Sequence, residues 1–375
     1  MKKLLFVSTL ILTGFFISQS QEKNAPVAEP VQLVVDSHDN VYFLHRNGLG
    51  KITFDGKYID LKNVKGNDRK TPYTSAEVNM VIDAEDNLYV SSGNTITKYT
   101  INDKNEITRT PFLTEFYKYR QKDGPLKDAM FSSIKHMAND KEGNIYILEA
   151  YSKTQRMDTS NVNFLTDNFY LKKNKKPDQL TVIRKISVDG MVSTLKNGQG
   201  KYIILEDFVQ DIIMDADNNL VYTNSTARTV EKIDLTTGKK SLLAGKPYKR
   251  ATCPTYVVGD TSKAELFDPG MLAINKNGDI FYADVRAQRI TKISKGKVST
   301  VAGNGAIQPC HANIQGLAQE GHKDGKALTA LFAYPKGIAF DSKGNLFIAD
   351  EWNNCIRKLS SDGIVSSLNP VFKKY

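Results

Sequence analysis

The sequence predicts an all-β protein that folds into a six-bladed β-propeller. Three observations predict this fold: the length of the chain, six related segments along it, and the tight turns inside those segments. The chain has 375 residues, about two to three times the usual domain size, which favours several domains or one large repetitive fold. Its composition, 40% hydrophobic and 25% charged, excludes wholesale disorder, collagen and a multispan membrane protein.

Six segments share an apolar stretch, a turn that begins with Asp or Asn, and a second stretch rich in Ile, Val, Tyr and Phe. The turns begin at Asp36, Asp83, Asp140, Asp215, Asn275 and Asp341. These positions are 47 to 75 residues apart, a period that fits one supersecondary unit per repeat.

Each repeat is expected to form four antiparallel strands. Asp, Asn and Gly accept the left-handed backbone that a tight hairpin turn needs, so the first turn joins two strands directly. A third strand has a pattern such as Ile290-Thr291-Lys292-Ile293, and a second turn such as Val188-Asp189-Gly190 leads to the fourth. Six such units close radially and leave only short, protected edges. The blades are expected to begin near residues 31, 78, 134, 209, 270 and 336.

The last repeat resembles a known family. Residues Pro335 to Lys358 look like an NHL repeat almost throughout, and Lys323-Asp324-Gly325 to Phe332 resembles the lead-in of secreted bacterial NHL proteins. The resemblance implies a six-bladed propeller over the mature chain. Because the family includes RNA readers, protein-interaction platforms and a few lyases, it leaves the function open.

The N-terminus has the pattern of a secretory signal peptide. Lys2 and Lys3 precede an apolar run from Leu4 to Ile17, which is shorter than the ~20 residues of a membrane span. We therefore expect a signal peptide over residues 1–20, a propeller over 21–375, no membrane span, and a secreted or periplasmic protein. Loss of the two lysines lowers the formal net charge from +10 to +8. This charge favours anionic partners or is simply a solubility feature, and export makes nucleic acid an unexpected partner.

The long connections are expected on one face of the propeller. In an antiparallel meander, the connections from the second to the third strand and from the fourth strand to the next blade share one face, here called the loop face. The remaining connections form the turn face. Ser152 to Leu180 and the ranges 114–132, 246–268 and 304–334 are all loop-face connections. Long loops on a rigid scaffold commonly carry function, so we expect the ligand site on the loop face.

Two columns of mostly polar residues end at the loop face. The start column, four residues before each signature Asp or Asn, consists of Gln32, Asn79, His136, Asp211, Met271 and Gly337. The end column, nine residues after it, consists of His45, Ser92, Glu149, Asn224, Asp284 and Asp350. Side chains from both columns, together at the mouth of a central channel, would bind a polar ligand or one Ca²⁺ or Zn²⁺ ion, because hard cations prefer clustered oxygen ligands and imidazole suits zinc.

We accordingly expect a binding or interaction module that captures a protein, peptide or glycan ligand on the loop face. The alternative is a metal-assisted lyase or lactonase with its site at the channel mouth. A structural alternative also stays open for Asp284 and Asp350, since an acid that ends the second strand commonly caps the following loop through backbone N–H groups.

Aromatic and basic residues add to the loop face. Trp352, the single tryptophan, and Tyr151 both follow a second strand, where their rings would stack on sugar or peptide or simply pack within the loop. Four lysines lie close to aromatic residues in the long connection of the third repeat: Lys172, Lys173, Lys175 and Lys176. They would dock an anionic partner or form a solvated loop.

The three cysteines cannot all pair with one another in an oxidising compartment. Cys253 and Cys310 occupy equivalent places in consecutive loop-face connections, which adjacent blades would bring together. Cys355 sits at the start of a third strand, where a small buried thiol fits. We predict a Cys253–Cys310 disulfide and a free Cys355.

Overall fold

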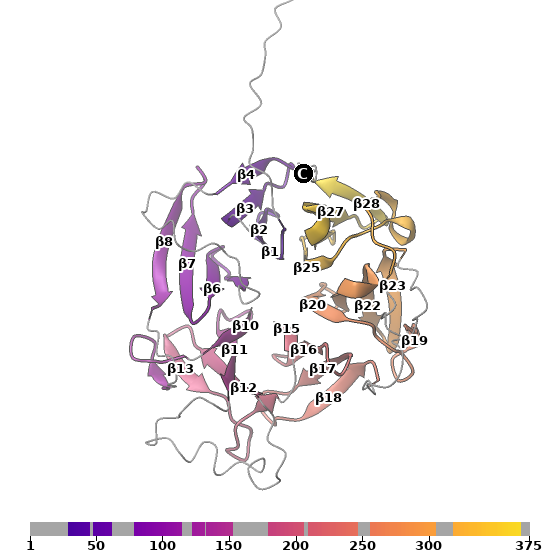
Figure 1. Ribbon diagram of the computed structural model, residues 1–375. Coiled ribbons are helices and arrows are strands. Elements are labelled where there is room, and N and C mark those ends of the chain that lie inside the picture. The colour runs from indigo at the N-terminus through magenta and orange to yellow at the C-terminus, as the bar shows by residue number, and fades with distance from the viewer. Residues whose placement is uncertain are drawn as a thin grey trace, which may run out of the picture.

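The computed structural model describes residues 29–45, 48–61, 79–114, 122–131, 133–152, 179–205, 209–246, 256–304 and 318–368. Six antiparallel sheets surround a central channel, and β1, β10, β15, β20 and β25 are among the strands that face it (Figure 1). The predicted all-β fold with six blades is confirmed. No helix in the described ranges has the length and apolar character needed to cross a membrane.

The strands of blades 1 to 3 follow one another from the channel outward in chain order. Blade 1 consists of β1 (Gln32–Val35), β2 (Val41–His45), β3 (Gly48–Ile52) and β4 (Tyr58–Asp60). Blade 2 consists of β5 (Met80–Ile82), β6 (Leu88–Ser92), β7 (Thr95–Ile101) and β8 (Ile107–Leu113). Blade 3 consists of β10 (Ile134–Asn139), β11 (Ile145–Ser152), β12 (Gln179–Ile186) and β13 (Met191–Thr194).

Blades 4 to 6 repeat the arrangement. Blade 4 consists of β15 (Val209–Met214), β16 (Leu220–Asn224), β17 (Thr229–Ile233) and β18 (Lys240–Ala244). Blade 5 consists of β20 (Pro269–Ile274), β21 (Ile280–Asp284), β22 (Arg289–Ser294) and β23 (Lys297–Ala302). Blade 6 consists of β25 (Pro335–Phe340), β26 (Leu346–Asp350), β27 (Cys355–Leu359) and β28 (Ile364–Leu368).

Three blades have an additional outer strand that the four-strand pattern does not include. β9 (Gly124–Pro125) pairs with β13, β19 (Gly259–Asp260) with β23, and β24 (Gly325–Lys326) with β28. In blade 3, β14 (Ile204–Leu205) also pairs with β12. These short strands cover part of the outer edge of each sheet, where unpaired backbone groups would otherwise face solvent.

The hairpin turns have the predicted chemistry. In the turn after β1, Asp36 Oδ1 accepts hydrogen bonds from the backbone N–H groups of His38 and Asn40 at 3.0 and 2.7 Å. The residue before Asn40 is left-handed, with a φ of 62° at Asp39, and Gly344 has a φ of 82° at the same place in blade 6. Aspartate and glycine are among the residues that tolerate this conformation.

The lysine of the third-strand pattern reaches back to the same turns. Lys98 Nζ lies 3.9 Å from Asp83 Oδ2, and Lys232 Nζ lies 3.6 Å from Asp215 Oδ2. The sequence pattern that predicts the third strand therefore also supplies the cation that partners the turn carboxylate of the same blade.

The hydrophobic core lies between neighbouring blades. One cluster joins Val81 and Ile96 of blade 2 to Ile134 and Ile147 of blade 3. Full burial of a side chain of this size stabilises the folded state by roughly 1.5–3 kcal/mol. Lateral packing of blade on blade, repeated around the ring, therefore holds the six sheets together.

Blades 1 and 6 close the ring without sharing a strand, because each sheet is built from its own continuous segment. At this junction Gly337 lies so close to blade 1 that an added Cβ would be 2.8 Å from Gln32 Cα. Phe43 of blade 1 and Phe347 of blade 6 belong to one buried cluster. Packing and side-chain hydrogen bonds thus form this junction, here called the closing seam.

A turn-face staple strengthens the closing seam, and its removal is expected to weaken the fold. Asp39 Oδ1 accepts the Ser342 backbone N–H at 2.8 Å, and Asp39 Oδ2 accepts the Ser342 hydroxyl at 2.9 Å. Asp39→Ala is expected to lower the free energy of unfolding by about 1–3 kcal/mol, because both bonds between the blades are lost. Urea unfolding followed by circular dichroism measures the change.

Asn218→Ala is the matched control for this staple. Asn218 has a φ of 61° in the corresponding turn of blade 4, so alanine meets the same backbone strain there. Within the described ranges, the side chain of Asn218 makes no hydrogen bond to another blade. Equal losses of stability in the two variants would show that strain, and not the staple, accounts for the effect at Asp39.

Candidate functional site

The six inner strands enclose a channel cavity of ≈ 250 Å³. Most of its described lining is apolar, with side chains such as Val34, Met80 and Ile338, and Asp211 is the one ionisable residue there. A single carboxyl group in a largely apolar cavity is the kind of convergent polar group that fixes the orientation of a ligand.

Asp211 is paired across the blade junction with His136, as expected for two start-column residues of neighbouring blades. His136 Nδ1 lies 3.9 Å from Asp211 Oδ1, and both side chains are largely buried. Burial lowers the pKa of His136 to about 4, although a hydrogen bond to the Val209 backbone opposes this shift. Burial also raises the pKa of Asp211 to about 7, although hydrogen bonds from the backbone N–H groups of Leu272 and Ile212 oppose this rise.

The distance between the two groups is too long for a direct hydrogen bond. His136 Nδ1 is buried and has no hydrogen-bond partner among the described residues, whereas Asp211 Oδ2 accepts the Leu272 N–H at 2.8 Å. A neutral imidazole can accept a hydrogen bond, and a carboxyl group near its pKa can donate or accept one. The pair is therefore suited to one polar group placed between or beside them.

Gln32 and Asn79 of the start column also link their blades to the next blade. Gln32 Oε1 accepts the Met80 N–H at 2.8 Å, and Asn79 Nδ2 donates to Lys135 O at 2.6 Å. The bond from the Leu272 N–H to Asp211 has the same direction around the ring. The start column thus also helps to hold neighbouring blades together, a role that the sequence did not predict.

The acids of the end column accept backbone N–H groups from the loop that precedes the inner strand. Asp284 Oδ1 accepts the Asp268 N–H at 2.8 Å, and Asp350 Oδ1 accepts the Ala333 N–H at 2.7 Å. The structural alternative expected such contacts in the loop that follows the second strand, and there neither Asp284 nor Asp350 caps the 3₁₀ turn through its side chain. Burial nevertheless raises the pKa of Asp284 to about 7, with Arg289 opposing the rise, and its Oδ2 has no hydrogen-bond partner in the described part of the chain.

Two end-column acids belong to buried arginine clusters. Glu149 Oε2 accepts Arg184 Nη1 at 2.7 Å in blade 3, and Asp350 Oδ2 accepts Arg357 Nη1 at 2.7 Å in blade 6. Neither arginine has any solvent exposure. Asp123 and Asp324 complete the clusters at 2.9 and 2.6 Å from the respective Nη2 atoms.

The sequence interpretation missed both arginines. A signal was present: Lys122-Asp123-Gly124 and Lys323-Asp324-Gly325 are the same tripeptide, each followed by a Phe seven residues after the Gly. The arginines bind these segments further, since Arg184 Nη2 donates to Lys122 O at 2.9 Å and Arg357 Nη2 donates to Lys323 O at 2.8 Å. The clusters anchor the loop-face connections that precede blades 3 and 6.

The remaining end-column residues bond or pack within their own blades. His45 is 1% exposed, and its ring centroid lies 5.6 Å from that of Phe43. Asn224 Oδ1 accepts the Ala227 N–H at 2.8 Å. The close polar pair at the channel mouth therefore consists of His136 and Asp211.

Trp352 lies at the inner rim of blade 6, in the 3₁₀ turn η5 (Glu351–Asn353) that follows β26. It is 44% exposed, and its ring stacks on Tyr334 with centroids 4.0 Å apart and planes inclined by 13°. Tyr334 was not singled out in the sequence, because its partner is brought to it only by the pairing of β25 with β26.

Residues 332–359, which include most of blade 6, match the family model of the NHL repeat. The chain is a six-bladed β-propeller with an NHL repeat in blade 6. A 140-residue segment is 31% identical to the protein SUPPRESSOR OF QUENCHING 1, chloroplastic, of Arabidopsis thaliana; the match covers 36% of this chain and 12% of the plant protein. The chain therefore spans only a small part of the length of this relative.

Two solved structures of auxiliary nutrient binding proteins resemble the NHL-repeat propeller, one from Bacteroides thetaiotaomicron VPI-5482 and one from Bacteroides ovatus ATCC 8483. Each aligns with a TM-score of 0.58 and 15% sequence identity over 92% of this chain and 70% of its own. At this identity the likeness shows the fold, and the residues of the site have to be judged from this chain.

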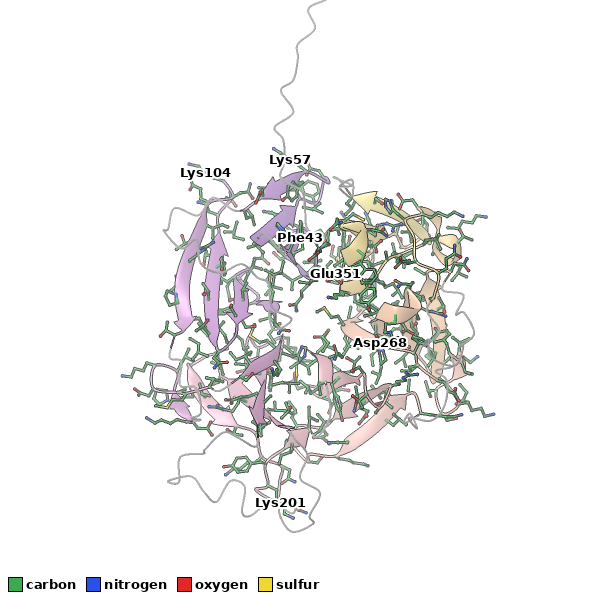
Figure 2. All side chains as sticks on the ribbon, viewed as in Figure 1. Phe43, Lys57, Lys104, Lys201, Asp268 and Glu351 are labelled. Atoms are coloured by element: carbon green, nitrogen blue, oxygen red, sulfur yellow. The ribbon has the colours of Figure 1, made fainter. Side chains whose placement is uncertain are left out.

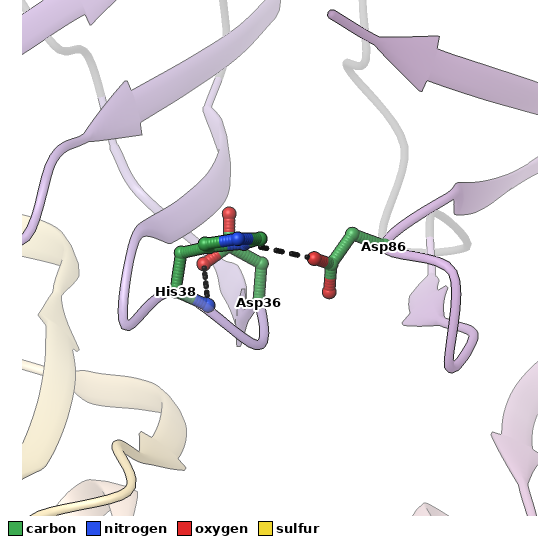
Figure 3. A group of neighbouring side chains, drawn as sticks. All are labelled: Asp36, His38 and Asp86. Carbon is green, nitrogen blue, oxygen red and sulfur yellow. Dashed lines mark hydrogen bonds and ion pairs between the residues drawn. The ribbon is translucent and has the colours of Figure 1, made fainter. Parts of the chain in front are cut away.

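The turn face of the propeller carries a cluster of three potential metal ligands, Asp36, His38 and Asp86 (Figure 3). Their carboxylates already accept hydrogen bonds, as Asp36 does from Asn40 Nδ2 at 2.8 Å and Asp86 from the Ser37 hydroxyl at 2.6 Å. The corresponding staple at the closing seam has Lys343, 3.6 Å from Asp39, in the place of His38. The cluster is thus a second contact between blades of the same kind as the staple at the closing seam.

The calcium or zinc ion expected at the channel mouth remains a prediction. Among the described residues, the turn-face cluster is the one group of three or more His, Cys, Asp or Glu side chains with ligand atoms within 4.8 Å of one another. His136 and Asp211 alone would supply two ligands, fewer than either ion usually takes from a protein.

The predicted disulfide partners Cys253 and Cys310 lie outside the described residues, as do the lysines of the third-repeat connection and the predicted signal peptide. Cys355 is a buried free thiol. Burial raises its pKa to about 12, which keeps the thiol protonated and poorly reactive at neutral pH.

Proposed function

We propose that this NHL-repeat propeller is an exported binding module that captures a small polar ligand on the loop face, at the mouth of the central channel. The observation that carries the proposal is the His136–Asp211 pair, 3.9 Å apart, with Asp211 lining the cavity. Lys2, Lys3 and the apolar run after them support export.

The chemistry of the pair favours a ligand with hydroxyl or similar groups. A neutral His136 offers a buried acceptor, and the Asp211 carboxyl changes its protonation near neutral pH. A buried carboxyl with a strongly shifted pKa that faces a cavity is typical of binding and catalytic sites. The apolar lining contributed by residues such as Met271 and Ile338 would contact the less polar surface of the ligand.

The resemblance to auxiliary nutrient binding proteins supports the same function class, although it rests on the fold. A nutrient taken up outside the cell would be a sugar, a peptide or a similar polar molecule. A protein partner or an acidic glycan is compatible with the net charge of +10 for the whole chain.

The test is a ligand screen followed by one substitution at the pair. Thermal-shift measurements against neutral and uronic oligosaccharides, dipeptides, CaCl₂ and ZnCl₂ identify a ligand, and calorimetry gives its affinity. Asp211→Asn is expected to weaken binding by roughly 5- to 150-fold, equivalent to about 1–3 kcal/mol, since a buried polar contact to the ligand is altered.

Asp217→Asn is the matched control, because Asp217 is an exposed residue in the turn between β15 and β16 of the same blade. Unchanged affinity in both variants would contradict the proposed site. A stoichiometric Ca²⁺ or Zn²⁺ that is lost in Asp211→Asn would instead favour the metal-dependent lyase or lactonase.

A further inference from the structure

The inner rims of blades 5 and 6 carry equivalent turns with different side chains. A 3₁₀ turn follows the second strand in each: η3 (Val285–Ala287) after β21 and η5 (Glu351–Asn353) after β26. Val285 N–H donates to Asp268 O, and Glu351 N–H donates to Tyr334 O, both at 3.2 Å. Asp268 and Arg286 of blade 5 therefore occupy the places of Tyr334 and Trp352 in blade 6.

The aromatic pair of blade 6 is held firmly in position. Trp352 N–H donates to Ala333 O at 3.0 Å, and Tyr334 N–H donates to Gln288 Oε1 of blade 5 at 2.6 Å. Tyr334 has a φ of 59°, a conformation that costs a bulky residue energy and persists only where surrounding contacts enforce it. The stack is thus a rigid platform with little conformational entropy to lose when a ligand binds.

Charged side chains belong to the same turn of blade 6 and to the equivalent turn of blade 5. Lys336 Nζ lies 2.7 Å from Glu351 Oε1 within blade 6. In blade 5, burial raises the pKa of Asp268, and the guanidinium groups of Arg286 and Arg228 oppose the rise. Glu351 and Asp268 both lie on the channel side of their neighbouring blades (Figure 2).

We propose that this rim is a subsite for one sugar ring of a glycan, stacked on the exposed surface of Trp352 and hydrogen-bonded by the Lys336–Glu351 pair and by Asp268 and Arg286. The subsite deepens the proposed function and rests on it, because it names the ligand class of the same loop face. It adds Tyr334, Lys336, Asp268 and Arg286 to the residues that the sequence indicated.

A sugar fits this chemistry better than a peptide does. Sugar hydroxyls donate and accept at once, so they match carboxylates beside ammonium and guanidinium groups, while the apolar C–H face of a pyranose fits an aromatic plane. Peptide docking usually uses a free sheet edge or an apolar groove. The rim residues described here are instead a half-exposed aromatic ring and charged side chains of the same and the equivalent turn.

The protein provides its own reporter for a test, because Trp352 is the single tryptophan of the chain. Its fluorescence is titrated with maltohexaose, cellohexaose, mannohexaose, chitohexaose and a hexamer of galacturonic acid, and each hit is measured by calorimetry. At least one sugar is expected to change the emission saturably. Trp352→Ala should weaken the binding of that sugar about tenfold or more, whereas Trp352→Phe should keep it within about threefold.

Phe54→Ala is the control, because Phe54 is an exposed aromatic residue on the turn face, 72% exposed, and its loss should leave sugar binding unchanged. The inference is overturned if no hexasaccharide alters the emission, or if Trp352→Ala binds the sugar as wild type does. It is also overturned if a phage-displayed heptapeptide library yields Trp352-dependent binders while every sugar fails.

The two proposals fail in different ways. A ligand whose binding is lost in Asp211→Asn but unchanged in Trp352→Ala would leave the channel-mouth site standing and remove the sugar subsite. A sugar that needs Trp352 but is indifferent to Asp211→Asn would place binding on the rim alone and contradict the proposed channel-mouth function.

Discussion

Arg357→Ala is expected to lower the free energy of unfolding by about 3–5 kcal/mol, because the substitution leaves a buried carboxylate without its counter-charge. Arg357 has no solvent exposure and donates to Asp350, Asp324, Leu331 O and Lys323 O. Burial raises the pKa of Asp350, and contacts with Asn353 and Arg357 oppose this rise. Urea unfolding monitored by circular dichroism measures the loss.

Lys358→Ala is the matched control, since Lys358 is the next residue of β27 and is only partly buried. Its loss should be within about 1 kcal/mol of wild type. A double variant, Asp350→Asn with Arg357→Met, should recover part of the stability because no buried charge is left unpaired. Equal stability of Arg357→Ala and Lys358→Ala would contradict the structural role assigned to the cluster.

Asp211 and Asp284 are each expected to lose a contribution to the stability of the fold as the pH rises from about 4 to about 7. The pKa values of Asp211 and Asp284 are raised to about 7 by burial, whereas in the unfolded chain they lie near 3.8. Between these values the folded state keeps a proton that the unfolded state has lost. The stability that each proton contributes is full below about pH 4 and is lost as the pH approaches 7, at roughly 2–4 kcal/mol per group.

Comparison of wild type with Asp211→Asn isolates one of these contributions. The amide cannot ionise, so the decrease in unfolding free energy between pH 4.5 and pH 8 should shrink by roughly 2–4 kcal/mol in the variant. Asp217→Asn should reproduce the wild-type profile, since Asp217 is exposed. Parallel profiles for wild type and Asp211→Asn would show that Asp211 is ionised in the folded protein throughout this range.

The blades could be predicted because their signals are local. Asp36, Asn40 and the left-handed residue between them lie within one turn. The strands on either side of the turn are predicted from apolar residues only a few positions away. The junction of His136 with Asp211 was also within reach, because equivalent positions of neighbouring blades must face one another once the ring is assumed.

The rest depends on pairs of residues far apart in the sequence. Arg184 lies in a third strand, and its partner Asp123 lies in the connection that precedes the whole blade, so the residues around Arg184 do not indicate its burial. β9 pairs with β13, although most of blade 3 lies between the two strands in the sequence. No local sequence pattern therefore predicts β9. The stack of Tyr334 on Trp352 likewise exists only once the two strands of blade 6 are in register.

The closing seam also has a mechanical meaning. Because β1 and β25 belong to separate sheets, a force that pulls the first and last blades apart acts on side-chain contacts such as Asp39 with Ser342 and Phe43 with Phe347. It does not act along a ladder of β hydrogen bonds. Under such a force we therefore expect the ring to open at this junction into a linear row of intact blades before any blade unravels, and the channel, which needs all six inner strands, to be lost at that first step.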